Sequence, residues 1–136
     1  MLVLAAFIIS QPAFTQGKGR FHRSAKKKKV ERVEYGTASY YHNKFDGRRA
    51  ANGEIFRQSK LTAAHNNVPF GTWLKVTNLR NHKTVIVKVI DRLHYKNRRL
   101  VDLSKAAANK IDFSSEGLLR VKVEVLGKKK PRLKNT

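Results

Sequence analysis

The alternation of apolar and polar residues is clearest in residues 83–92, the segment KTVIVKVIDR. Five of its residues are valine or isoleucine, whose branched side chains favour a strand over a helix. Alternation places Val85, Val87 and Val89 on one face and two isoleucines on the other, so most of both faces can be covered. We therefore predict a central strand that ends in the charged pair Asp91-Arg92.

The residues before this segment predict a partner strand. In residues 73–79, a tryptophan, a lysine and a threonine alternate with Leu74, Val76 and Leu79. The polar residues 78–83 then form a hairpin loop that leads into the central strand. This pair is predicted to be antiparallel.

Three more strands are predicted along the chain. Residues 30–41 mix aromatic and β-forming residues around Gly36, which marks a bend or a close approach of another segment. Residues 99–103 form a short strand, and residues 118–126 (LLRVKVEVL) alternate as a half-exposed closing strand does. The pattern as a whole predicts a mainly β domain.

Between the strands, the sequence predicts one loop with two turns and one helix. The loop spans residues 42–54, where Asp46-Gly47 and Asn52-Gly53 are strong turn dipeptides. The helix follows Ser104, a good N-cap, and covers the alanine-rich residues 105–111.

Length and the lack of cysteine limit what the chain can be. Its 136 residues are enough for one domain of ordinary size with a core, plus tails. Without cysteine, the chain can form no disulfide, thiolate metal site or lipid attachment at a cysteine. No spacing of histidine and acid suits a metal and no phosphate loop is present, so we expect neither metal nor cofactor.

The first residues predict export. Residues 1–10 are mostly apolar, and Ala13 and Thr15 precede Gln16 as a signal peptidase site requires. The run is too short to span a bilayer and lacks basic residues before it, so we interpret residues 1–15 as a truncated or atypical signal peptide. An exported chain without cysteine fits the periplasm or envelope of a Gram-negative bacterium, in a form that is not a lipoprotein.

The net charge of +21 is concentrated at the two flanks. Residues 18–32 carry eight basic residues and residues 128–134 carry five. We therefore divide the chain into a flexible basic arm (16–32), one domain (33–126) and a basic tail (127–136). The flanks are expected to attach to anionic polymers or membrane surfaces without specificity. They are the only support for nucleic-acid binding, so no specific nucleic-acid partner is expected, and the protein is expected to be a monomer.

Asp91 is the first candidate for chemistry. At the end of a central strand, its side chain is held by the sheet yet can face a cleft. The alternative is that Asp91 pairs with Arg92 or caps a turn. Tyr35, Tyr40 and Tyr41 are core, rim or sugar-stacking residues, and the pattern leaves these alternatives open.

Seven short motifs, taken in order, resemble the rare lipoprotein A (RlpA-like) family. They are Tyr35-Gly36-Thr37-Ala38-Ser39-Tyr40-Tyr41, Gly47-Arg48-Arg49-Ala50-Ala51-Asn52-Gly53-Glu54, Leu61-Thr62-Ala63-Ala64-His65, Val68-Pro69-Phe70-Gly71-Thr72, Val76-Thr77-Asn78-Leu79, Asp91-Arg92 and Val101-Asp102-Leu103-Ser104. The resemblance implies a six-stranded double-psi β-barrel with one or two short helices. It also implies septal lytic transglycosylase activity on peptidoglycan glycan strands.

The resemblance assigns active-site positions residue by residue. It places catalytic residues at Glu54, His65 and Asp91, with Asp91 as the acid/base, and the alternative for the other two is a turn-capping glutamate and a surface histidine. The expected substrate-binding residues are Tyr40, Tyr41, Asn52 and Arg92. The chain departs from the family at Leu93-His94, where Gly-Pro usually follows Asp-Arg.

The implied reaction breaks the β-1,4 bond between N-acetylmuramic acid and N-acetylglucosamine while the sugar's own C6 hydroxyl closes a 1,6-anhydro ring. One carboxyl group can serve as acid and then as base, so the paired spacing of hydrolytic glycosidases is not needed. This role requires Arg92 to point away from Asp91. The rival hypothesis is a non-catalytic, expansin-like wall module whose groove binds glycan without cutting it.

Overall fold

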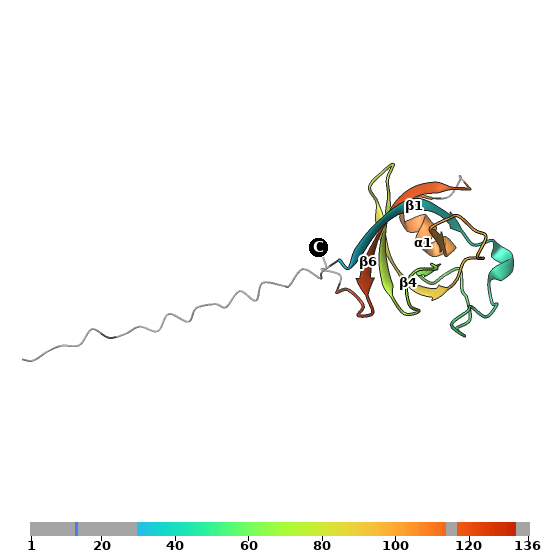
Figure 1. Ribbon diagram of the computed structural model, residues 1–136, viewed down its shortest axis with the longest axis horizontal. Coiled ribbons are helices and arrows are strands. Elements are labelled where there is room, and N and C mark those ends of the chain that lie inside the picture. The colour runs from blue at the N-terminus through green and yellow to red at the C-terminus, as the bar shows by residue number, and fades with distance from the viewer. Residues whose placement is uncertain (1–12, 14–29, 114–116, 133–136) are drawn as a thin grey trace, which may run out of the picture.

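The computed structural model describes residues 13, 30–113 and 117–132. The predicted signal peptide and most of the basic arm lie outside these residues. The elements are β1 (Arg32–Tyr40), the 3-10 helix η1 (Asn43–Phe45), β2 (Thr62–Ala64), β3 (Trp73–Asn78), β4 (Thr84–Asp91), β5 (Val101–Leu103), α1 (Lys105–Lys110) and β6 (Leu119–Gly127) (Figure 1).

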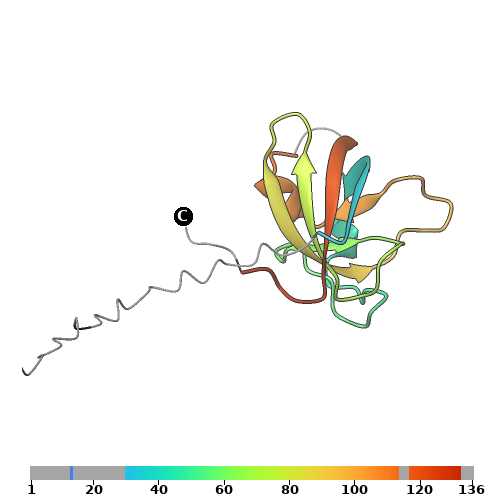
Figure 2. The same cartoon turned by 60° about the vertical axis from the view of Figure 1, so that its left-hand side comes forward.

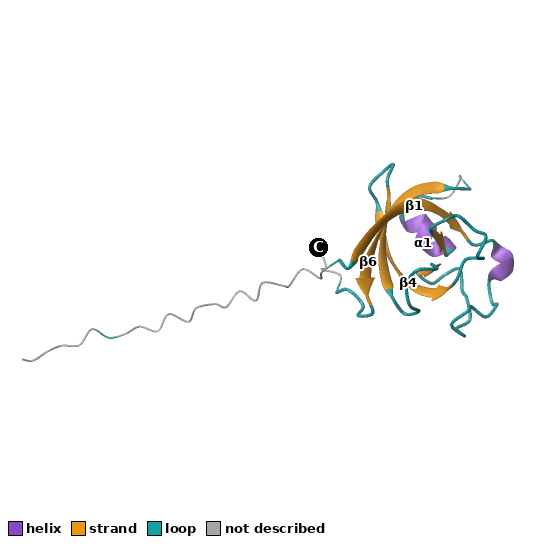
Figure 3. Cartoon of the chain, in the orientation of Figure 1, coloured by secondary structure: helices purple, strands orange, loops and turns teal. Residues whose placement is uncertain are grey.

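The six strands close into one barrel in the order β1-β5-β2-β4-β3-β6. Figure 3 shows the strands in orange. The pairs β1–β5 and β2–β4 are parallel, and the other four pairs are antiparallel. Closure leaves the sheet without a free edge. The predicted mainly β, six-stranded barrel with one or two short helices is confirmed.

The predicted central strand is β4, which lies between β2 and β3. Val85, Val87 and Val89 are buried in the main core, whereas Thr84 is exposed on the opposite face. Its antiparallel pairing with β3, through the hairpin of residues 78–83, is also as predicted.

One detail of β3 differs from the prediction. Leu79 was expected to share the inward face with Leu74 and Val76, but Asn78 takes that place and Leu79 lies beyond the end of the strand. Asn78 is buried because its Nδ2 donates a hydrogen bond of 2.8 Å to the carbonyl of Ile111 at the end of α1. A satisfied amide can occupy a core position that a pattern of apolar residues does not assign to it.

Gly36 is a point of close approach, as the sequence indicated. A Cβ atom placed there would lie 2.7 Å from Cβ of Leu100, in the segment that leads into β5. The absence of a side chain lets this segment reach β1, where the parallel ladder pairs Ala38 with Val101.

The segment between β1 and β2 covers the outside of the barrel at the end of β4. Ala50, Phe56 and Ile90 form a second small core, against which Tyr41 and Phe45 pack. Figure 2 shows this segment in teal and green at the opposite end of the molecule from the β3–β4 hairpin loop. The end of β4 therefore meets an ordered loop rather than open solvent.

Within the described residues, no helix is long and apolar enough to cross a membrane. The same part of the chain holds no group of three or more histidine and acidic side chains placed to bind a metal ion.

Candidate active site

A cavity of about 760 Å³ opens at the end of β4. It is bounded by the end of β1, the segment around η1, the residues that follow β4, and β5. Three of the predicted substrate-binding residues, Tyr40, Tyr41 and Arg92, line it together with Asp91. The size is typical of a ligand site in an enzyme.

The carboxylate of Asp91 is held by three donors. Its Oδ1 accepts backbone N–H groups from Ala51 at 3.0 Å and from Arg92 at 2.9 Å, and its Oδ2 accepts the hydroxyl of Tyr41 at 2.6 Å. A carboxylate oxygen has about two lone-pair sites, so Oδ1 is saturated and Oδ2 keeps one site for a further partner. Of the two oxygens, Oδ2 is therefore the one that keeps acceptor capacity beyond its partners among the described residues.

Arg92 points away from the carboxylate of Asp91. Its guanidinium carbon lies 3.9 Å from the ring centroid of Phe70, and its Nη1 donates a 2.8 Å hydrogen bond to the carbonyl of His65. Stacking and hydrogen bonding together fix this orientation. The guanidinium of Arg92 therefore does not pair with the carboxylate of Asp91.

The hydroxyl of Tyr41 donates to Asp91. Burial, and after it the hydrogen bond to Asp91, raise the pKa of Tyr41 above its ordinary value of 10.0. Its ring packs against Phe56 and Phe45, with centroids 4.4 and 5.7 Å away. Tyr40, the neighbouring residue, packs edge-on against Phe113 at 5.1 Å. Both tyrosines thus combine packing with exposure to the cavity.

Asn52 and Glu54 lie on the turn next to Asp91 but are not among the residues that line its cavity. The side-chain Oδ1 of Asn52 accepts the N–H of Glu54 at 2.9 Å, so the turn is capped by Asn52 rather than by the glutamate. Glu54 is half exposed and its Oε1 lies 3.0 Å from Nζ of Lys88. The carboxylate of Glu54 faces a second cavity on the outer face of β4.

His65 is fully buried, so it is not the surface histidine that the sequence allowed as an alternative. Its Nδ1 accepts the N–H of Asn67 at 3.0 Å, which places the imidazole proton on Nε2, 3.3 Å from Oε2 of Glu34. Burial lowers the pKa of His65 below 6.5, although the Glu34 carboxylate opposes this shift. The side chain of His65 has no exposed surface to offer a ligand. The residue contacts the site through its backbone N–H and carbonyl groups.

The cavity contains a second carboxylate, which the sequence pattern did not single out as a site residue. Asp102 accepts hydrogen bonds from Arg99 Nε at 2.9 Å and Nη2 at 3.0 Å, and from the hydroxyl of Ser39. The hydrogen bonds to the carboxylate of Asp102 raise the pKa of the Arg99 guanidinium. The signal was present, because an acid between the buried Val101 and Leu103 must face away from the core.

Residues 33–123 match the profile of a protein family described as "Lytic transglycolase". The chain belongs to this family. The match reaches from β1 into β6 and takes in the whole cavity around Asp91. The resemblance carried by the seven motifs is thereby confirmed.

Curated relatives of this lytic transglycolase chain are similar over the same region. The "Endolytic peptidoglycan transglycosylase RlpA" of Haemophilus influenzae is 45% identical over 94 residues, which are 69% of this chain and 33% of the relative. The protein of the same name from Campylobacter jejuni is 48% identical over 92 residues, 68% of this chain and 34% of that one. The chain thus spans about a third of the length of these relatives.

Solved structures share the barrel of this family member. A Streptomyces papain inhibitor superposes with a TM-score of 0.59 at 23% identity, over 71% of this chain and 96% of its own. An apo expansin of Clavibacter michiganensis gives a TM-score of 0.57 at 21% identity, over 74% of this chain and 53% of its own. At these identities the likeness concerns the fold alone.

After Asp91-Arg92 the chain departs from the usual family sequence at Leu93-His94. The structure accommodates these two residues without opening the site. Leu93 is buried, and its N–H donates a 2.8 Å hydrogen bond to Oδ1 of Asn66. His94 is exposed and lines the cavity. The replacement therefore adds an imidazole to the rim and keeps the segment packed.

Proposed function

We propose that this protein is an endolytic peptidoglycan lytic transglycosylase with Asp91 as its single acid/base. One observation carries the proposal: in a member of the lytic transglycolase family, the cavity contains a carboxyl group with one oxygen saturated and the other open to a ligand. The names of the relatives supply the substrate, peptidoglycan glycan strands, and with it a place of action in the cell envelope.

In the first step, protonated Asp91 gives its proton from Oδ2 to the glycosidic oxygen between N-acetylmuramic acid and N-acetylglucosamine. The bond from C1 of the muramic acid to this oxygen breaks, and the electron pair stays with the departing N-acetylglucosamine hydroxyl. Tyr41 keeps its own proton throughout and continues to donate to Asp91.

In the second step, the C6 hydroxyl of the same muramic acid attacks C1 and closes the 1,6-anhydro ring. Its proton passes to Asp91 Oδ2, which restores the starting protonation state. No water is consumed and no proton is lost, so one carboxyl group is sufficient.

We assign Glu54 and His65 positioning roles. Glu54 ties its turn to β4 through Lys88, and the same turn brings the N–H of Ala51 to Asp91. The N–H of His65 donates to the carbonyl of Asp91 at 3.2 Å. Its buried imidazole holds this backbone in place through Asn67.

We propose that the glycan contacts Tyr40, Tyr41 and Arg92 on the cavity wall, with Asp102 orienting Arg99 beside them. Asn52 contributes through the shape of the turn. The basic flanks are proposed to concentrate the protein on anionic wall polymer or membrane surface, an attraction that salt weakens.

The test is product analysis on purified, peptide-stripped peptidoglycan in water enriched in oxygen-18. Mass spectrometry is expected to find internal cleavage with 1,6-anhydromuramic ends and no heavy oxygen. Ends that carry oxygen-18 would show that water cleaves the glycan, and the protein would then be a hydrolase and not a transglycosylase. Binding to the glycan without any product would favour the non-catalytic wall module.

A further inference from the structure

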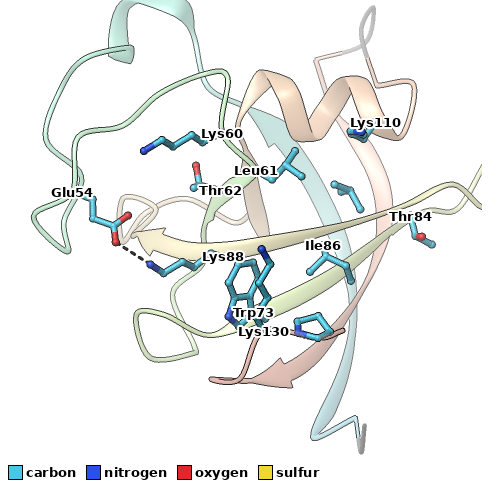
Figure 4. A pocket seen from close by; sticks show the side chains of 12 residues that line it. Glu54, Lys60, Leu61, Thr62, Trp73, Thr84, Ile86, Lys88, Lys110 and Lys130 are labelled. Carbon is cyan, nitrogen blue, oxygen red and sulfur yellow. Dashed lines mark hydrogen bonds and ion pairs between the residues drawn. The ribbon is translucent and has the colours of Figure 1, made fainter. Parts of the chain in front are cut away.

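A second cavity, of about 690 Å³, lies on the outer face of the barrel. Figure 4 shows it running along the outer face of β4, past Trp73 on β3, from Glu54 and Lys60 at one end to Thr84 and Lys110 at the other. We call it the lysine groove. It does not include Asp91, and of its lining residues the proposed reaction uses only the positioning pair Glu54 and Lys88.

The wall of the lysine groove is apolar. Leu61, Trp73, Ile86 and Pro131 line it, and none of these four side chains is buried in either core cluster. Leu61 is 37% exposed. An apolar strip of this kind, kept open on the outside of a closed barrel, is typical of a surface that binds another molecule.

The rim of the lysine groove is cationic. It carries Lys60, Lys88, Lys110 and Lys130 against one carboxylate among the described lining residues, that of Glu54. Lys88 lies opposite Trp73 in the β3–β4 ladder, and Nζ of Lys130 lies 5.6 Å from the centroid of its ring. Since one lysine is paired with Glu54, the charge that remains attracts an anion.

We propose that the lysine groove is a docking site for an acidic segment of a partner protein, in which carboxylates alternate with apolar side chains. Ammonium groups on a rim select carboxylates, and the apolar strip between them selects side chains such as leucine or phenylalanine. A segment that alternates carboxylates with apolar side chains suits the groove because successive side chains of an extended segment point to opposite sides. One set can then meet the lysines of the rim while the other lies on the apolar strip. The proposal does not depend on the proposed reaction.

Two other anionic or sugar ligands fit the lysine groove less well. A single-stranded nucleic acid needs successive aromatic rings for its bases, and the described lining residues contain one. A neutral glycan gains nothing from the charge of four ammonium groups, and besides these the lining offers it one aromatic ring, two threonines and a glutamate that is already paired.

Trp73 gives a direct readout, because it is the single tryptophan of the chain. The full chain is titrated with a synthetic peptide that alternates glutamate and leucine and has blocked ends, while tryptophan fluorescence is followed. A saturable change is expected that weakens with salt and is lost when glutamine replaces glutamate in the peptide.

Two helix positions provide a matched pair of variants. Lys110→Gln at the end of α1 is expected to weaken binding about threefold, and together with Lys60→Gln about tenfold. Lys105→Gln removes the same charge from the first residue of α1, outside the groove, and is expected to leave binding unchanged. Thermal unfolding checks that all variants are folded.

The proposal is overturned if the acidic peptide leaves the fluorescence unchanged, or if the glutamine peptide binds equally well. It is also overturned if Lys105→Gln weakens binding as much as Lys110→Gln does. Tighter binding of a single-stranded oligonucleotide, a glycan oligosaccharide or an anionic vesicle, sensitive to Lys110→Gln, would assign the groove to that ligand instead.

Discussion

The two oxygens of Asp91 have different neighbours, and this difference decides how the residue can act. Two backbone N–H groups hold Oδ1, so the carboxyl group cannot rotate without breaking both bonds. The single bond from Tyr41 leaves a second site on Oδ2, which the proposed reaction uses for the proton. A substitution that changes Oδ2 or its donor Tyr41 is therefore expected to alter how Asp91 acts.

Tyr41→Phe is expected to slow formation of anhydro products about ten- to a hundredfold, because a hydrogen bond to a charged group is worth about 1.5–3 kcal/mol. The ring still packs on Phe56, so the fold is expected to persist. Product yields are compared by mass spectrometry with those of Tyr35→Phe, an exposed tyrosine on β1. Equal rates for Tyr41→Phe and the wild type would show that this hydroxyl does not support Asp91.

At the scale of elements, the cavity depends on the pairing of the short strand β5 with the end of the long strand β1. The parallel ladder between β1 and β5 places Ser39 opposite Asp102. This ladder forms because the segment before β5 crosses Gly36 closely. A change at Gly36 is therefore a test of the element packing that builds one wall of the cavity.

Gly36→Ala is expected to lower the free energy of unfolding by about 1–3 kcal/mol, since its Cβ would lie 2.7 Å from Cβ of Leu100. Gly117→Ala is the control, because no atom of the described residues, apart from its own chain neighbours, lies within 4 Å of the added carbon. Urea denaturation of both variants measures the difference. A Gly36→Ala protein as stable as the control would mean that the two segments are not tightly packed.

The sequence predicts the elements with regular alternation and misses what depends on contacts between distant segments. The faces of β4 and β6 follow from period-two patterns, and the N-cap at Ser104 follows from local chemistry. Asn78 is buried because a carbonyl 33 residues away accepts its amide, which no local pattern records.

The sequence predicts only part of the candidate site, because the rest depends on contacts between distant segments. The end of a strand and the family motifs together predict Asp91 and its neighbours Tyr41 and Arg92 as site residues. The role of Asp102 depends on Ser39, 63 residues away, and the burial of His65 depends on closure of the barrel. Alternation shows that Asp102 faces away from the core, but neither its contact with Ser39 nor the burial of His65 can be read from alternation or from turn chemistry.

At the scale of the whole molecule, closure of the barrel buries an ionisable group. His65 lies among Glu34, Arg32 and Arg92, and burial is the largest cause of its lowered pKa. In mild acid the unfolded chain therefore binds a proton at His65 that the folded chain does not. The contribution of neutral, buried His65 to the free energy of unfolding is expected to be complete above pH 6.5, the ordinary pKa, and to fall as the pH drops below it.

His65→Gln is expected to flatten this part of the pH dependence while lowering stability at every pH, because it removes the titrating group and leaves an imperfect fit. The free energy of unfolding is measured in urea at about pH 7 and about pH 5 for both proteins. The exposed His82→Gln serves as the control. An unchanged slope in His65→Gln would mean that other groups cause the acid sensitivity.

The central claim is that Asp91 transfers the proton that cleaves the glycan, and Asp91→Asn tests it most directly. The amide keeps the size of the side chain and an acceptor for the two backbone N–H groups, but it removes the exchangeable proton. Asp112→Asn, at an exposed position paired with Lys83, is the matched control.

Anhydro products from peptide-stripped peptidoglycan and binding to insoluble glycan are measured for the wild type and both variants. The expected result is a loss of at least about a hundredfold in anhydro products for Asp91→Asn alone, with glycan binding retained by all three proteins. Equal yields from the wild type and Asp91→Asn would contradict the account.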